Sequence, residues 1–296
     1  MHGARKTDFI EVKMIYLILA VLASSAVSII MRMGEGRVKN SFAMFMANYF
    51  VCSAIALGFV LAGDKPTSGE GLPFALLLGA FAGILYLTCF VFLKYNITRN
   101  GVMLASVFMK LGVIIPLLIA IIFFKESPSA LQVIGFIVAA AAIIIIYFEK
   151  DPEKKKRKGL SSAALLILLF IIGGLTNSLA NIYEKLGYAQ YKNHYMLFTF
   201  LSAFLLSTAV TVYKKHMVTK YDVIYGAAIG VPNYFATRLL ILSLSSVPAV
   251  IVYPVYNVGA IVLIGLAGMF IFRESVKGRR LIGYIMIIAS LILLNI

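Results

Sequence analysis

Apolar residues gather into long runs along this chain, and most charged residues fall in the short segments between the runs. Each run is roughly 20 residues long, which is the length that a helix needs to cross the hydrocarbon core of a bilayer. Helix is the expected structure, because an open sheet in lipid would leave backbone groups without hydrogen-bond partners. We therefore predict an all-α polytopic membrane protein with ten transmembrane helices. The expected spans are 14–33, 42–62, 73–94, 101–124, 130–148, 161–186, 195–213, 222–243, 248–272 and 279–296.

The composition of the chain favours the same medium. Hydrophobic residues make up 61% of the chain and charged residues 13%, which is far from the balance of an ordinary soluble domain. The net charge of +15 raises the question of nucleic acid, but the basic residues lie in short loops, where Lys and Arg face anionic lipid headgroups. We expect the lipid bilayer as a partner and no nucleic acid.

One stretch of the chain occurs twice. The first copy, FKESPSALQVIGF, covers 124–136, and the second, FRESVKGRRLIGY, covers 272–284, at an offset of 148 residues in a chain of 296. A second match, at an offset of 153 residues, aligns SSAVS at 24–28 with NSLAN at 177–181, and Arg32 with Lys185. The sequence thus predicts an internal duplication.

The duplication divides the chain into two halves joined by a charged linker. The first apolar run follows a basic stub and in this resembles a signal peptide, but its match in the second half identifies it as span 1. Because each repeat has five spans, the second repeat must start on the opposite side of the membrane. The two five-helix repeats are then inverted, as in many secondary transporters. The expected units are a tail at 1–13, a first repeat at 14–148, a linker at 149–159 and a second repeat at 160–296.

Three features together carry a resemblance to a known family: ten spans in two groups of five, a small and polar first span that ends in Arg or Lys, and a Phe-x-Glu turn before a span that opens with Ile-Gly. In these features the chain resembles the EamA-type transporters of the drug/metabolite transporter superfamily. The resemblance implies movement of a substrate by alternating access, with a pocket lined by spans 1, 3, 4, 6, 8 and 9. It fixes no substrate, since the superfamily handles amino acids, sugars, nucleotide derivatives, cations and organic anions.

Two basic side chains stand out inside the expected spans: Lys110 lies near the middle of span 4, and Arg238 lies in the second half of span 8. An ionisable group at membrane depth is costly and usually faces a cavity or a partner. None of the 12 carboxylates is central in a span, and only Glu184, near the end of span 6, is placed to reach inward. Three explanations stay open: the substrate supplies the negative charge, Lys110 is uncharged, or Glu184 pairs with one of the two cations.

Polar residues at helical spacing surround these two cations. Ser106 lies one turn before Lys110, and Tyr253, Tyr256 and Asn257 form the matching face of span 9. Ser, Asn and Tyr in membrane helices often serve helix packing instead, so a purely structural role is the alternative for each of them. The expected substrate-binding residues are Ser28, Tyr86, Ser106, Lys110, Asn177, Asn181, Asn233, Tyr234, Arg238, Tyr253, Tyr256 and Asn257.

We favour the first explanation, in which the substrate brings the anionic charge. The expected function is secondary transport of a small anionic or zwitterionic metabolite, such as an amino acid, an organic acid or a phosphorylated compound. One alternative is an exporter of cationic drugs or quaternary amines, which the tyrosine faces would bind by cation–π contacts. The other alternative is a lipid-phosphate flippase, because paired cations between helices also suit a phosphate headgroup.

The sequence favours a transporter over an enzyme. His2, His194 and His216 lie in the tail or near loops, and no metalloprotease, nucleophile-elbow or phosphate-loop pattern is present. We expect no catalytic residue, no metal and no cofactor, and a multi-pass protein of the plasma (cytoplasmic) membrane that is a monomer or a homodimer. The loop charges favour termini outside the cytoplasm, whereas the family resemblance implies termini inside. The direction of transport and its coupling to protons or exchange are left open.

Overall fold

The computed structural model describes residues 2–63, 69–115, 118, 129–147, 162–215, 217–244, 249–274 and 278–294. The charged linker and residues 124–128 of the first repeated turn lie outside the described residues.

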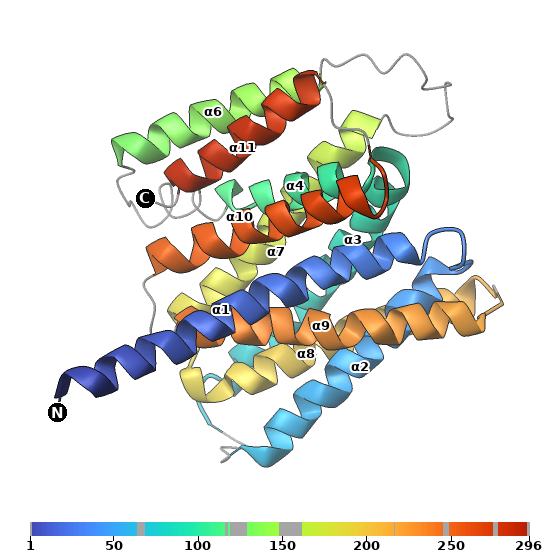
Figure 1. Ribbon diagram of the computed structural model, residues 1–296. Coiled ribbons are helices and arrows are strands. Elements are labelled where there is room, and N and C mark those ends of the chain that lie inside the picture. The colour runs from blue at the N-terminus through green and yellow to red at the C-terminus, as the bar shows by residue number, and fades with distance from the viewer. Residues whose placement is uncertain are drawn as a thin grey trace.

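Within the described ranges the regular structure is helical, and each expected span contains an α-helix (Figure 1). Several helices differ from their expected bounds. α1 begins at His2, inside the expected tail, and α3 continues to Asn100, beyond residue 94. α4 ends at Leu111, after which residues 114, 115 and 118 are again helical. The helices are α1 (His2–Met33), α2 (Ser41–Ala62), α3 (Leu72–Asn100), α4 (Val102–Leu111), α6 (Ala130–Tyr147), α7 (Ser162–Leu186), the 3₁₀ helix η1 (Ala189–Tyr191), α8 (Lys192–Tyr213), α9 (Lys220–Leu244), α10 (Ala249–Phe270) and α11 (Arg279–Leu294).

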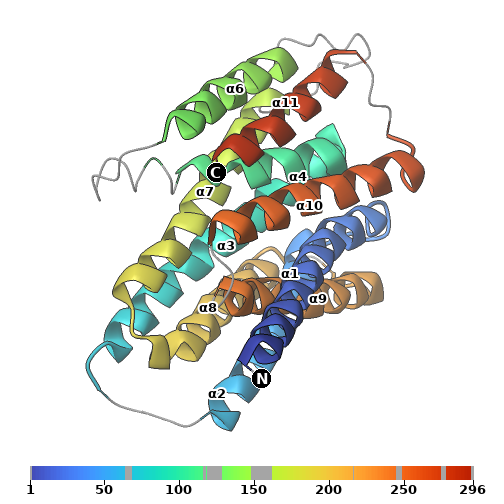
Figure 2. The ribbon, with the colours of Figure 1, turned by 60° about the vertical axis from the view of Figure 1, so that its left-hand side comes forward.

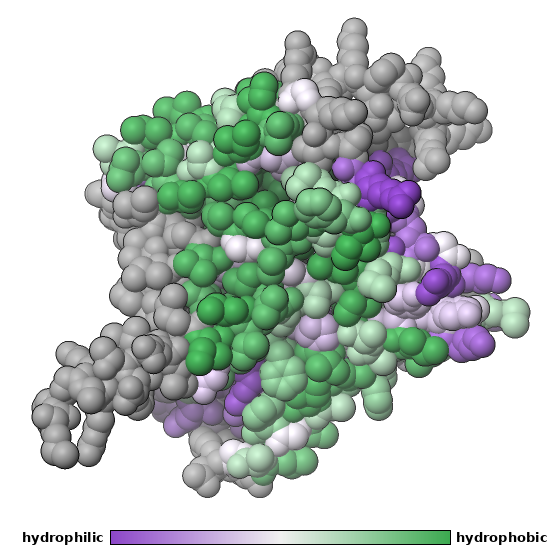
Figure 3. All heavy atoms as spheres, viewed as in Figure 1, coloured by the Kyte–Doolittle hydropathy of each residue, from purple (hydrophilic) through white to green (hydrophobic). Residues whose placement is uncertain are grey.

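The helix surfaces fit a membrane. Among the described residues, four stretches are long and apolar enough to cross it: Ile15–Met33, Ser41–Ala62, Leu72–Asn100 and Ala189–Tyr213. Shorter apolar stretches lie in α4, α6, α7, α10 and α11. Figure 3 shows apolar residues over most of one face, with polar residues at its right-hand edge and in a smaller patch at its lower left. The chain is therefore a helical membrane protein.

Helices of the first half pack mainly on helices of the second half (Figures 1 and 2). The packing pairs are α3 with α8 and α2 with α9, then α1 with α9 and α3 with α7, then α1 with α10 and α4 with α7. α2 also packs on α8, and α4 on α10. α6 and α11 pack on each other at one side of the bundle.

Two of these crossings are close because glycines lie at them. A Cβ on Gly83 of α3 would come within 2.3 Å of the Thr199 carbonyl oxygen of α8. A Cβ on Gly226 of α9 would come within 2.2 Å of the Met44 carbonyl oxygen of α2. Each glycine has a second one four residues away, Gly79 and Gly230, so both crossings use the small-xxx-small spacing that lets membrane helices approach.

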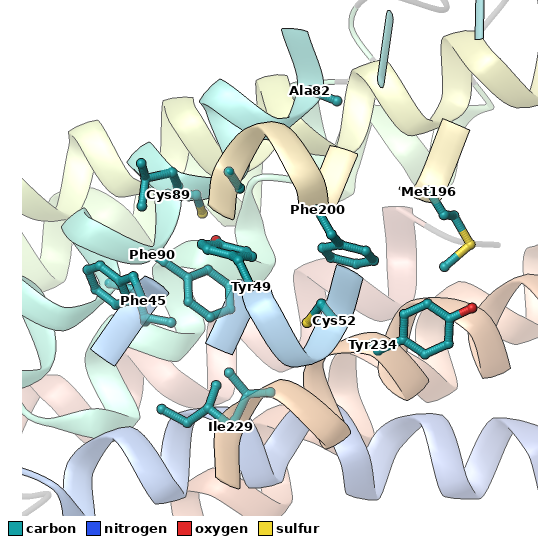
Figure 4. Close-up of a cluster of buried hydrophobic side chains, with 14 of the residues drawn as sticks. Phe45, Tyr49, Cys52, Ala82, Cys89, Phe90, Met196, Phe200, Ile229 and Tyr234 are labelled. Carbon is teal, nitrogen blue, oxygen red and sulfur yellow. The ribbon is translucent and has the colours of Figure 1, made fainter. Parts of the chain in front are cut away.

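Aromatic side chains fill the core where α2, α3, α8 and α9 meet (Figure 4). The ring of Tyr49 lies 5.7 Å from that of Phe90 and 6.5 Å from that of Phe200, between centroids. Tyr234 contacts Phe200 at 5.8 Å and stacks on Phe59 at 5.8 Å. These rings join helices from both halves into one apolar core, which holds the polar groups described next in fixed positions.

Candidate functional site

A cavity of about 210 Å³ lies between helices of both halves. Its lining comes from α1, α3, α4, α7, α8, α9 and α10, so it includes every helix from which the family resemblance predicted a pocket, together with α8. The polar and aromatic lining residues are Ser24, Tyr86, Cys89, Phe90, Lys110, Thr176, Asn177, Tyr183, Lys192, Tyr195, Asn233, Thr237, Tyr256 and Asn257.

Lys110 is the central charge of this cavity. Its side chain is buried, and its Nζ donates a hydrogen bond to Ser24 Oγ at 2.8 Å. The same Nζ lies 4.0 Å from the ring centroid of Tyr256, a cation–π contact. In the part of the chain that the structure describes, the ion pairs are those of Arg32 with Glu35 and with Glu274. No described carboxylate therefore pairs with Lys110.

The helix that carries Lys110 is interrupted directly after it. α4 ends at Leu111, and the Gly112 and Val113 amides donate to carbonyls three residues back, those of Met109 and Lys110, at 3.2 and 3.3 Å. A Cβ on Gly112 would lie 2.6 Å from the Gly174 nitrogen of α7, so only glycine permits this approach. An interrupted helix at a binding site is a recurring feature of secondary transporters.

The cavity extends from Lys110 toward one end of the bundle. It reaches Lys192 and Tyr195 at the start of α8, and Tyr183 stacks on Tyr195 with ring centroids 4.2 Å apart. Tyr188, just before α8, contacts Gly71 at the start of α3. We call this the cavity end.

The opposite end of α3 lies at Gly101, which contacts the Glu274 carboxylate. At this end of the bundle two carboxylates bind backbone amides of neighbouring segments, and we call it the clamped end. Asp222, at the start of α9, accepts hydrogen bonds from the backbone of the α1–α2 connection. Glu274, after α10, accepts hydrogen bonds from the start of α4.

The structure brings six of the expected site residues together around the cavity. They are Tyr86, Lys110, Asn177, Asn233, Tyr256 and Asn257. Asn233 is partly committed elsewhere, because its amide donates to Asn48 Oδ1 at 3.2 Å. The side chains of Asn181 and Tyr253, and that of Glu184, lie outside the described part of the chain.

Four expected residues do not line the cavity: Ser28, Ser106, Tyr234 and Arg238. Arg238 is half-buried, with its guanidinium 3.5 Å from the Phe59 ring centroid and hydrogen-bonded to Asn193 Oδ1 at 3.1 Å and to Tyr234 at 3.4 Å. The sequence located this arginine correctly in a helix but could not show that α2 and α8 supply its partners.

Sequence reasoning also missed several functional candidates. Lys192 lines the cavity, although it precedes the expected span 7 and so counted as a loop residue. Lys94 is another buried cation, because α3 continues to Asn100, and its Nζ contacts the Met31 carbonyl at 3.3 Å. For Lys94 the available signal was its place at the end of an apolar run.

Comparison with known proteins gives one match that concerns the fold and one that concerns the family. A crystal structure of another protein superposes with a TM-score of 0.61 at 13% sequence identity, and the match covers 96% of both chains. At this identity the likeness shows the fold alone. No curated protein matches the sequence. The model of the EamA-like transporter family matches residues 12–148. This match confirms the resemblance seen in the sequence and shows that residues 12–148 are similar to the EamA-like transporter family.

Proposed function

We propose that this protein is a secondary transporter that moves a small anionic or zwitterionic metabolite across the membrane by alternating access. Lys110 carries the proposal: it is a buried cation in a cavity between the two halves, and its described contacts are a hydroxyl and an aromatic ring. A buried charge needs a partner of opposite sign. A carboxylate or phosphate of the substrate would supply it.

The helix packing supports ten spans in two inverted repeats. If α1, α2, α3, α4 and α6 correspond to α7, α8, α9, α10 and α11, exchange of the halves leaves the set of main packing pairs unchanged: α3 on α8 becomes α9 on α2, and α1 on α10 becomes α7 on α4. Such an exchange is what a two-fold axis between the repeats produces. An odd number of spans in each repeat places that axis in the membrane plane.

The glycine contacts support the same relation at the level of single residues. Gly83 meets Thr199 as Gly230 meets Asn48, and these pairs are offset by 147 and 151 residues. Likewise Gly112 meets Gly174, and Gly259 meets Val21. Close contacts repeated in this way are expected when both halves derive from one ancestral unit. The domain division at 14–148 and 160–296 follows from this proposal.

The alternatives have less support from the cavity. A cation exporter would use the Tyr256 ring, but that ring already lies against the Lys110 ammonium. A lipid-phosphate flippase would need the cavity to open sideways toward the bilayer. We place the transporter in the plasma membrane, in keeping with its apolar surface and basic loops. Transport of cationic drugs is therefore one outcome of the transport experiment.

The test is uptake of labelled carboxylates, amino acids and phosphorylated metabolites into proteoliposomes. Lys110→Met should reduce transport of an anionic substrate at least about tenfold, because a charge-assisted contact contributes roughly 1.5–3 kcal/mol. Arg238→Met is the matched control: it removes a cation that does not line the cavity, so transport should persist. Transport of cationic drugs alone, unchanged in Lys110→Met, would refute the proposal.

The two cysteines offer an independent check of the cavity. Cys89 lines it, whereas Cys52 is buried against Asn48, Gly230 and Asn233. A small impermeant thiol reagent should modify Cys89 and leave Cys52 unmodified, and a transported substrate should protect Cys89. Equal reaction of both cysteines, or lack of protection, would contradict the cavity assignment.

A further inference from the structure

A line of polar groups runs from Lys110 to the clamped end, between α1 and α4. On α1, Ser24, Ser28 and Arg32 follow one another at four-residue spacing, which places them on roughly one face. On α4, Ser106 lies between Lys110 and the first residue, Val102. Ser24 contacts Lys110, and Arg32 contacts Glu274, which binds the start of α4. The two helices therefore run antiparallel, with Ser28 and Ser106 at a similar level.

The two serines in the middle of this line are unusual. Both side chains are 0% exposed, and neither hydroxyl oxygen has a hydrogen-bond partner among the described residues. Buried serines in membrane helices commonly donate to the carbonyl four residues back, as Ser25 and Ser178 do here at 2.8 Å. A buried hydroxyl without a hydrogen-bond partner lowers the stability of the fold. Two such hydroxyls at the same depth in the bundle therefore need an explanation.

Glu274 closes the line at its outer end. Its carboxylate accepts hydrogen bonds from the amides of Val102 at 2.7 Å and Met103 at 3.2 Å, and its Oε1 lies 3.6 Å from Arg32 Nε. Free amides at a helix N-terminus favour a carboxylate. Gly101, with φ +85°, permits this approach, since a Cβ there would lie 2.8 Å from the carboxylate.

We propose that Glu274, Arg32 and the start of α4 form the closed gate of the transport pathway, and that Ser28 and Ser106 line the pathway behind it. When Glu274 leaves α4, the two hydroxyls face water and the polar groups of the substrate, which explains why they are polar and yet unpartnered in the closed state. This inference rests on the proposed function and extends it to the half of the pathway beyond Lys110.

The test measures the access of an impermeant thiol reagent to Ser28→Cys and Ser106→Cys in a background that carries Cys52→Ala and Cys89→Ala. In otherwise unchanged protein these two cysteines should react slowly from either face of the membrane. Adding Glu274→Gln should accelerate their reaction roughly tenfold or more, because charge-assisted hydrogen bonds to two amides are weakened. The acceleration should appear only from the face that carries the clamped end.

Two controls make the result specific. Glu35→Gln also removes a partner of Arg32 but leaves the start of α4 intact, so it should not accelerate the reaction. Gly101→Ala should act like Glu274→Gln, because its Cβ would displace the carboxylate. If Glu274→Gln does not fold, Gly101→Ala provides the same measurement, and Ser24→Cys, reactive from the cavity end, reports an intact cavity.

The outcomes separate this inference from the proposed function. Equal reaction rates with and without Glu274→Gln or Gly101→Ala, or acceleration from both faces, would overturn the gate. Acceleration from the clamped end in a protein that transports no anion would retain the gate and refute the proposed substrate class.

Discussion

Asp222 and Glu274 occupy the same end of the molecule and do the same chemistry, yet their surroundings differ. Asp222 is 0% exposed and accepts hydrogen bonds from three amides, those of Lys39 at 2.8 Å, Asn40 at 3.1 Å and Thr219 at 2.8 Å. The Glu274 side chain is 15% exposed and binds two amides and a partly exposed arginine.

The difference separates a permanent contact from one that can be broken. Asp222 fixes the α1–α2 connection to α9, and α9 packs extensively along both α1 and α2. Glu274 joins the end of α10 to the start of α4, and these two helices face the cavity and contribute Tyr256 and Lys110 to it. A carboxylate buried away from water holds its amides in one arrangement, whereas one at the surface exchanges them for water at little cost. Movement at this end is therefore expected at Glu274.

The largest expected effect is from Asp222→Asn. The new amide nitrogen would face the Thr219 amide, leaving two donors opposed in a buried site, and the charge-assisted bonds to the other amides would weaken. We expect a loss of stability of about 2–4 kcal/mol, measured as a lower unfolding temperature in detergent. An unfolding temperature within a degree or two of the parent protein would show that Asp222 is not a permanent contact.

A smaller but still clear loss is expected where α9 crosses α2, the contact that Asp222 secures. Gly226→Ala would place a Cβ 2.2 Å from the Met44 carbonyl oxygen, and the helices would have to separate at a cost of roughly 1–3 kcal/mol. Gly58→Ala in α2 is the control, since its Cβ would meet nothing within 4 Å. Thermal unfolding of the two variants should differ, and identical curves would count against close packing at this crossing.

The smallest effect on stability is expected from Glu274→Gln. The glutamine still accepts a hydrogen bond from the start of α4, and the weak contact with Arg32 lies near the surface, so the loss should be about 1.5 kcal/mol. Transport kinetics should change far more than unfolding, because the closed state is selectively weakened. A stability loss as large as that of Asp222→Asn would remove the distinction between the two carboxylates.

The helices could be predicted from the sequence because each depends on the hydropathy of its own stretch of the chain. A run of apolar residues places a helix in lipid whatever its neighbours are, and each expected range does contain a helix. Lys110 could be located for the same reason, since a lysine inside such a run is visible in the chain. The bounds of α4 could not be predicted, because the interruption after Lys110 depends on the approach of Gly174 to Gly112.

The composition of the candidate site was less predictable, because helical spacing places residues on a face without showing what that face meets. Tyr234 and Arg238 share a face of α9, as expected, but that face meets Phe59 and Asn193. Ser28 and Ser106 point into the bundle, yet they lie beyond the cavity, toward Glu274. Ser24, one turn before Ser28, is the residue that meets Lys110.

The sequence by itself determined the medium, the approximate helices and the presence of a cation without an obvious anion, and it predicted an internal duplication, because hydropathy and repeated motifs are properties of the chain alone. The tertiary structure decided which polar groups line the cavity, which carboxylate is buried against the α1–α2 connection and which one binds the start of α4 near the surface. Those outcomes depend on the rotation and crossing of helices that are distant in sequence, and close glycine contacts between the two halves set that geometry.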